Sequence, residues 1–419
     1  MDNSESKTMT GAQSEPLPMG QAVGARTHAR NRHGWRIGMW LARLLLVLCL
    51  LGGFYFSVIP SGRAAVRAVT VLPGVLTAQQ PSWQAPIAEP ISHTQITIQS
   101  SAGPAYLDVY APTTSAPPVP GAREGLLVIP GIGDQRKDAQ LINFSQTLAR
   151  AGVVVMDITT PMLINLRLDA GDEAAVMQAF HVLQRWPGVG LNRVGLFGIS
   201  AGGGLICLAA ADPRIRDEIS SVTLFGSYFD VTTLLQAIGW RALTLDGQAQ
   251  PWHPVYFPMQ VLANTFAPFL PGNDGSVLAN TFAPTGRGTL SVGQIAQLAP
   301  ESVAVYHLLA GDQPARVDAN LAALSPALKA LLANLSPSRV VDGIHAPIYL
   351  LHDRSDQYVP VTESREFAAA LARLHHHYDF AEVGVFQHTE VRAGLGLPQL
   401  LGDAQNLLRL VSEVVQAGS

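Results

Sequence analysis

The segment Gly198-Ile199-Ser200-Ala201-Gly202 places a serine between two glycines in a G-x-S-x-G pattern. It follows an apolar run at 193–197 and precedes a run rich in Ala, Gly and Leu, so we expect a strand, a tight turn and a helix. Such a turn exposes the serine hydroxyl at the end of a sheet, and the flanking glycines let strand and helix approach closely. The free N–H groups at the helix N-terminus would stabilise a developing oxyanion. The pattern therefore predicts Ser200 as a nucleophile, against the alternative of an idle serine in a glycine-rich turn.

A serine nucleophile needs a general base, and the base needs an acid that orients it. After a serine in a strand–turn–helix, the expected chain order is acid and then histidine. Asp356 follows the apolar run 348–351, and His388 follows the run 378–383. Asp353 ends the first of these runs and remains an alternative for the acid. His352, beside it, is expected to be a buried neighbour of the acid loop.

Residues 91–415 resemble the α/β-hydrolase superfamily, especially bacterial esterases and dienelactone-hydrolase-like members. In this resemblance Ser200 matches the nucleophile, Asp356 lies in a D-x-x-V-P loop, and His388 lies in the last catalytic loop. Gln387 stands where glycine is common in the superfamily, which is a small departure.

The same resemblance implies an oxyanion hole made of two backbone N–H groups. One belongs to the residue after the nucleophile, here Ala201, and the other to the loop 130–133 after an early strand. Many members have His-Gly in this loop, where this chain has Pro130-Gly131. We take Ile132 as the second donor, with Gly133 as the alternative.

Apolar strands alternate with helices from residue 91 onward, which indicates a mostly parallel sheet with helices on both faces. Two alternating runs, 91–98 and 106–110, are typical of an antiparallel pair at its start. Residues 228–343 break the rhythm with aromatics, prolines and short helical stretches, and they predict an inserted cap. The fold class is therefore α/β, and the resemblance implies an α/β-hydrolase domain over 91–419.

Within the predicted cap, the octapeptide V-L-A-N-T-F-A-P occurs twice, at 261–268 and 277–284. Two copies are too few for a solenoid, so we interpret them as a local duplication that forms two similar helical turns. A further helix is expected at 319–332.

The N-terminal part of the chain predicts a membrane anchor. Residues 1–35 are polar and aperiodic, as in a disordered tail, and residues 61–90 are typical of a proline-rich linker. Between them, residues 37–59 are apolar except for Arg43, so one transmembrane helix is expected over 36–60. Arginines before this segment outnumber those after it, which favours an extracytoplasmic catalytic domain. A cleaved signal peptide is the alternative.

Composition narrows the partners and cofactors. A net charge of -4 gives no electrostatic basis for a nucleic-acid partner, and a charged fraction of 14% with 48% hydrophobic residues is typical of a folded chain. The tract His375-His376-His377 has no acidic or cysteine partner at ligand spacing, so no metal is expected.

Together these features predict a membrane-tethered serine hydrolase that cleaves a small or lipid-like carboxylic ester. It would use a Ser200–His388–Asp356 triad and an acyl-enzyme, without a cofactor. The same machinery serves amidases and acyltransferases, because a fold does not fix the substrate. An inactive binding protein on a hydrolase fold is the alternative from another class. The sequence predicts neither the substrate's identity nor the oligomeric state.

Overall fold

The computed structural model describes residues 89–113, 123–384, 386–388, 390–391, 402–403, 405–406 and 409. The predicted tail, the membrane anchor at 36–60 and most of the linker lie outside this set. Within the described part of the chain, no helix is long and apolar enough to cross a membrane.

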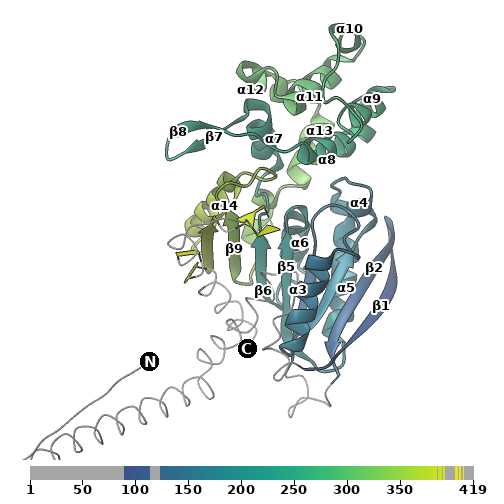
Figure 1. The fold of residues 1–419 in the computed structure, drawn as a ribbon, viewed down its shortest axis with the longest axis vertical. Helices are drawn as coiled ribbons and strands as arrows, with labels where there is room; N and C mark the ends of the chain where they lie inside the picture. Colours follow the sequence, from purple (N-terminus) through teal and green to yellow (C-terminus); the bar gives the residue numbers. More distant parts are fainter. Residues whose placement is uncertain are drawn as a thin grey trace, which may run out of the picture. The chain divides into compact units, whose positions relative to one another are not determined.

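An eight-stranded sheet forms the centre of the described domain (Figure 1). Its strands lie in the order β1-β2-β4-β3-β5-β6-β9-β10. They are β1 (Ile91–Ser100), β2 (Gly103–Pro112), β3 (Arg123–Ile129), β4 (Val154–Thr159), β5 (Val189–Ile199), β6 (Ile219–Phe225), β9 (Ile348–Asp353) and β10 (Tyr378–Val383). β2 pairs antiparallel with β1 and β4, and the other neighbours are parallel. The predicted mostly parallel sheet with an antiparallel pair at its start is confirmed.

Helices cover both faces of this sheet, because consecutive apolar residues of a buried strand point to opposite faces. Val128 of β3 packs with Leu141 on one face, whereas Leu127 belongs to a larger apolar cluster on the other. That larger cluster includes Phe180 and Ile206, which are fully buried. The helices are α3 (Ala139–Arg150), α4 (Pro161–Ile164), α5 (Glu173–Gln184), α6 (Ala201–Ala211) and α14 (Val361–Arg373).

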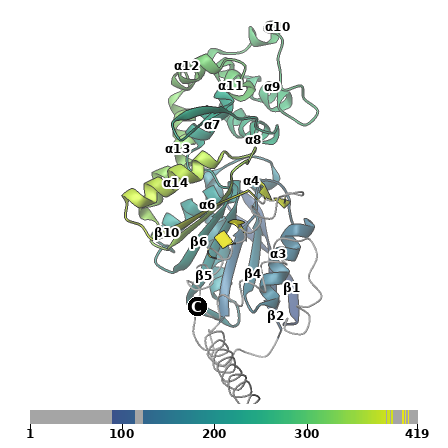
Figure 2. The same ribbon diagram turned by 60° about the vertical axis from the view of Figure 1, so that its left-hand side comes forward.

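The chain between β6 and β9 forms a helical cap, residues 227–347, whose helices gather beyond one end of the sheet (Figures 1 and 2). Its elements are α7 (Val231–Trp240), β7 (Ala242–Leu245), β8 (Gln248–Pro251), α8 (Phe257–Phe266), α9 (Asp274–Thr281), α10 (Val292–Ile295), α11 (Pro300–Ala310), α12 (Val317–Ala322) and α13 (Pro326–Asn334). The single helix predicted at 319–332 is wrong. Ser325 accepts the Leu328 N–H and Pro326 takes the first helical position, so a new helix begins there.

The two octapeptide copies lie mainly in α8 and α9, and they make different contacts. In the first copy, Thr265 Oγ1 accepts the Leu168 N–H (2.9 Å) and Asn264 donates to the Leu166 carbonyl (3.2 Å). In the second copy, the corresponding Asn280 is exposed. The first copy therefore ties the cap to the loop after α4, whereas the asparagine of the second copy faces solvent.

Candidate active site

Ser200 occupies a strained turn between β5 and α6. Its backbone has φ 53° and ψ −122°, a region that residues other than glycine rarely adopt. The Ser200 N–H donates to the carbonyl of Phe225 at the end of β6 (2.8 Å), which fixes the turn against the neighbouring strand. Strain of this kind costs roughly 1–3 kcal/mol and persists where the surrounding structure imposes it, often at functional sites.

Glycines on both sides make this turn possible. A Cβ atom at Gly198 would lie 2.4 Å from Gly203 Cα, and one at Gly202 would lie 2.3 Å from the Ile129 carbonyl oxygen. The helix α6 therefore packs against β5 and the end of β3 too closely for a side chain at position 198 or 202. A larger residue at either position would move α6, and the serine with it.

His388 and Asp356 form a buried hydrogen-bonded pair. His388 Nδ1 lies 2.7 Å from Asp356 Oδ2, and the two residues are 9% and 1% exposed. The other carboxylate oxygen accepts the N–H groups of Tyr358 (2.7 Å) and Val359 (3.1 Å). Because a carboxylate only accepts hydrogen bonds, Nδ1 carries the proton and Nε2 is left as the basic nitrogen.

Neighbouring charges keep Asp356 ionised. Burial alone would raise the pKa of this carboxyl, but the imidazoles of His388 and His352 hold the pKa well below its usual range. At neutral pH Asp356 is therefore an anion that stabilises positive charge on His388.

Gly226 connects the serine to this pair. It follows Phe225, whose carbonyl accepts the Ser200 N–H. A Cβ atom at Gly226 would lie 3.3 Å from His388 Nδ1 and 3.4 Å from Asp356 Oδ2, and the φ of Gly226 is +60°. The three predicted triad residues thus lie around the end of β6. Among the described residues no hydrogen bond joins Ser200 Oγ to His388, and such bonds are often long in substrate-free enzymes.

His352 contacts the same aspartate from inside β9. It is fully buried, with Nδ1 bonded to Ser364 Oγ (2.7 Å) and Nε2 to the Val359 carbonyl (2.9 Å). Its Nε2 also lies 3.4 Å from Asp356 Oδ2. Burial lowers the pKa of His352, but the contact with Asp356 outweighs burial and raises it. His352 is the buried, hydrogen-bonded neighbour of the acid loop that the sequence suggested.

Asp353, the alternative acid, makes a local turn instead. Its Oδ1 accepts both the N–H and the hydroxyl of Ser355, each at 2.7 Å. The carboxylate that meets His388 is that of Asp356.

The loop after β3 approaches the serine. A Cβ atom at Gly131 would lie 3.4 Å from Ser200 Cβ. The Gly133 N–H donates to a carbonyl in α4 (2.9 Å), whereas no described residue accepts the Ile132 N–H. Ala201 is the first residue of α6, where N–H groups have no partner within the helix. Of the two alternatives in the loop, the geometry favours Ile132.

Sequence reasoning missed Gly226 and two aromatic residues at the acid loop. The Tyr358 ring stacks on the His388 imidazole, with centroids 4.5 Å apart and planes inclined by 18°. Trp252 of the cap donates its indole N–H to the main-chain carbonyl of Asp356 (2.8 Å). Tyr358 lies within the D-x-x-V-P loop, so its position in the sequence could have indicated that it lies near the acid. Trp252 precedes Asp356 by 104 residues, and no local pattern links them.

The sheet order, the turn after β5, and an acid and a histidine after β9 and β10 form the arrangement that the resemblance implies. The domain has the α/β-hydrolase fold. The chain is similar to a puromycin-hydrolysing peptidase from Mycobacterium tuberculosis at 17% identity and a TM-score of 0.46, covering 78% of this chain and 38% of the peptidase. It is also similar to esterase B from Lactobacillus rhamnosis, at 15% identity and a TM-score of 0.41, covering 78% of this chain and 89% of the esterase. A third similar structure is Est1E from Butyrivibrio proteoclasticus, at 12% identity and a TM-score of 0.39, covering 77% of this chain and 96% of Est1E.

The chain spans about two fifths of the length of the peptidase structures it matches. No protein-family model matches the chain, and no curated protein does either. Identities this low leave the substrate open, so any chemistry proposed for the chain has to follow from its own site.

Proposed function

We propose that the chain is a serine hydrolase that cleaves a carboxylic ester through an acyl-enzyme. The observation that supports it most is the position of the strained Ser200 turn and the His388–Asp356 pair, which contact the consecutive residues Phe225 and Gly226. An idle serine turn gives no reason for a buried imidazole–carboxylate pair at the same strand end.

In this proposal His388 Nε2 removes the hydroxyl proton of Ser200 while the oxygen attacks the ester carbonyl carbon. The N–H groups of Ala201 and Ile132 stabilise the resulting oxyanion. The imidazolium then donates its proton to the leaving alkoxide. A water molecule, deprotonated by the same histidine, cleaves the acyl-enzyme and restores the serine. Asp356 fixes the imidazole tautomer and stabilises the imidazolium throughout.

The test is a panel of p-nitrophenyl esters from acetate to dodecanoate, with matching p-nitroanilides, assayed on the full chain in detergent. The expected result is ester turnover that falls by on the order of 10³-fold in Ser200→Ala. Faster anilide than ester hydrolysis would favour an amidase, and ester products formed with added alcohols would favour an acyltransferase. Undiminished turnover in Ser200→Ala, or none in folded wild-type protein, would contradict the proposal.

We further propose that residues 37–59 attach the enzyme to a membrane as a single-pass helix, with the catalytic domain on the extracytoplasmic side. The apolar run in the sequence supports this, and it makes a lipid-like ester a reasonable substrate. The full chain should remain in the membrane pellet after alkaline carbonate extraction, and external protease should digest its catalytic domain in spheroplasts. Release by carbonate would contradict the attachment.

A further inference from the structure

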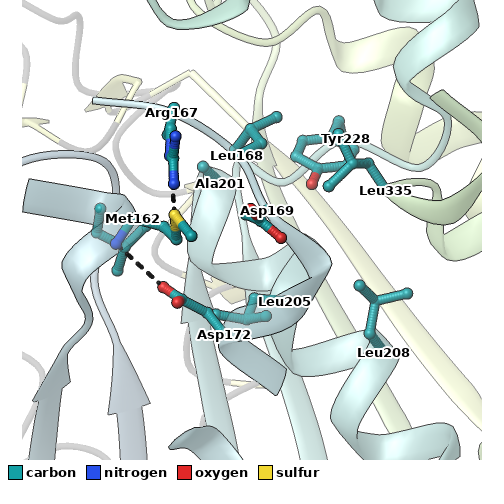
Figure 3. A pocket seen from close by; sticks show the side chains of 11 residues that line it. Met162, Arg167, Leu168, Asp169, Asp172, Ala201, Leu205, Leu208, Tyr228 and Leu335 are labelled. Carbon is teal, nitrogen blue, oxygen red and sulfur yellow. Dashed lines mark hydrogen bonds between the residues drawn. The ribbon is translucent and has the colours of Figure 1, made fainter. Parts of the chain in front are cut away.

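A small pocket opens beside the nucleophile turn (Figure 3). Its free volume is about 20 Å³, enough for one water-sized group. Ala201 forms part of its wall, so the pocket begins at the residue after Ser200. Most of the remaining wall is apolar and includes Met162, Leu205 and Leu335.

Asp172 contributes a carboxylate to this wall, next to Leu205 (Figure 3). The residue is 1% exposed. Its Oδ2 accepts the Met162 N–H (3.3 Å). Its Oδ1 has no partner within hydrogen-bonding geometry among the described residues, and the buried hydroxyl of the neighbouring Thr160, which lowers the pKa of this carboxyl, is likewise unpaired. A buried polar atom left without a partner costs roughly 1–3 kcal/mol. A ligand that supplies a donor would remove this cost.

Burial raises the pKa of Asp172 to about 6, against the opposing effect of its hydrogen bonds. The carboxyl group is therefore mostly ionised at neutral pH, and an incoming cation would increase that fraction.

The other charged residues that line the pocket, Asp169 and Arg167, have bonds of their own. Asp169 Oδ1 accepts the Gly171 N–H (2.8 Å), and Arg167 Nε donates to Met162 Sδ (2.9 Å). Within the described part of the chain, neither forms an ion pair with Asp172. Asp172 thus has no internal counter-ion at contact distance.

We propose that this pocket binds a primary ammonium group at the end of an alkyl chain on the substrate. The inference rests on the proposed function, because Ala201 then lies next to the scissile carbonyl. An ammonium group is water-sized and has three donors, so it can donate a hydrogen bond to a single unpaired carboxylate oxygen. A neutral alkyl end would leave Asp172 Oδ1 unpaired, and a site that bonds a polar group rejects analogues that lack it.

The test compares p-nitrophenyl esters of ω-amino acids, from 5-aminopentanoate to 8-aminooctanoate, with neutral esters in which a methyl group replaces the ammonium group. For at least one length, wild-type kcat/KM should favour the amino ester about tenfold or more. Asp172→Asn should abolish this preference. The ratio should grow as pH rises through about 6, since both esters share the rest of the mechanism. Asp169→Asn, in the same pocket, is the matched control and should keep the preference.

Equal kcat/KM for amino and neutral esters at every length would overturn the ammonium site and leave the serine hydrolase standing. Hydrolysis of neither ester by folded wild-type protein would contradict the proposed function itself. A second test measures how amines and alcohols inhibit neutral-ester hydrolysis by the wild-type protein. It tests the ammonium site even if Asp172→Asn is poorly folded. Hexylamine should inhibit wild-type protein at about tenfold lower concentration than hexanol, and equal inhibition would overturn the proposal.

Discussion

His388 and His352 both contact the same oxygen of Asp356, but their surroundings differ. His388 follows β10 with φ 60°, and no described residue binds its Nε2. His352 lies inside β9, where Ser364 and Val359 occupy its two ring nitrogens. Both histidines are near the acid, so nearness does not distinguish the proposed base. What distinguishes His388 is a ring nitrogen that no described residue binds. His352 instead fixes the acid loop from within the sheet.

The largest expected effects are on kcat, and they distinguish His388, which accepts the serine proton in the proposed mechanism, from His352, which does not. Ser200→Ala and His388→Ala should each lower kcat by on the order of 10³-fold or more, with folding intact. His352→Gln should lower kcat less than about tenfold, because His352 never accepts the serine proton. Its main effect is expected on stability, through the lost contacts of a buried polar group. Initial rates on the best ester, with thermal unfolding as the folding control, check both. Equal losses of kcat in His388→Ala and His352→Gln would erase the distinction.

The acid loop offers a matched pair of carboxylates. Asp356→Asn should lower kcat by on the order of 10³-fold, because the amide no longer fixes the imidazole tautomer. Asp353→Asn should leave kcat within about tenfold, since among the described residues the Asp353 carboxylate accepts hydrogen bonds only from Ser355. The assay is the same initial-rate measurement. Full activity in Asp356→Asn together with loss in Asp353→Asn would move the acid to Asp353.

A smaller effect is expected at the ring that stacks on His388. Tyr358→Leu should lower kcat/KM by roughly 2- to 10-fold, the equivalent of the 0.5–1.5 kcal/mol that aromatic pairs contribute. Tyr358→Phe keeps the ring and should stay within about twofold. Equal rates in the Leu and Phe variants would show that the stack does not position His388.

A second buried carboxylate, Asp157, is expected to affect stability and not turnover. Among the described residues both of its oxygens accept only the Ser145 hydroxyl (2.8 Å each), and Asp108 faces it from β2. Burial, with Asp108, therefore raises the pKa of Asp157 to about 8. The folded state then holds a proton that the unfolded chain releases near pH 4, so stability is lost as pH rises from about 4 to 8. Asp356 has the opposite sign, because its stabilisation is lost as pH falls below about 4.

Urea unfolding of wild-type protein and Asp157→Asn at pH 5 and pH 8.5 measures this difference. The wild-type loss between the two values should shrink in the variant by roughly 2–4 kcal/mol, because each pKa unit corresponds to about 1.4 kcal/mol and about three units separate pH 5 from the raised pKa of Asp157. An equally steep loss in the variant would contradict the assignment.

The sheet and the proposed triad residues could be predicted because their signals are local. Period-two and apolar runs revealed the strands. Ser200 directly follows one of them, and Asp356 and His388 each lie in the loop after another. The break between α12 and α13 also has a local signal, the helix start at Ser325 and Pro326. We missed it because the helical periodicity of 319–332 continues across the break.

Gly226 and Trp252 could not be identified in the same way, because their roles depend on distant parts of the chain. The glycine matters only because the pairing of β6, β9 and β10 brings Asp356 and His388 against it. The tryptophan matters only because the cap returns to the acid loop. Asp172 lies in no motif either, and its proposed role in binding follows from its burial and from its Oδ1, which has no partner among the described residues. Tertiary contacts of this kind leave no mark on sequence periodicity.

Labelling of the purified full chain with a fluorophosphonate probe, followed by peptide mapping, tests the central claim most directly. The probe reacts with a serine whose hydroxyl a neighbouring base activates. The proposed mechanism predicts label on Ser200, its loss in Ser200→Ala, and strong reduction in His388→Ala but not in His352→Gln. Folded wild-type protein that takes up no label at Ser200 would contradict an activated nucleophile and favour a binding protein on a hydrolase fold.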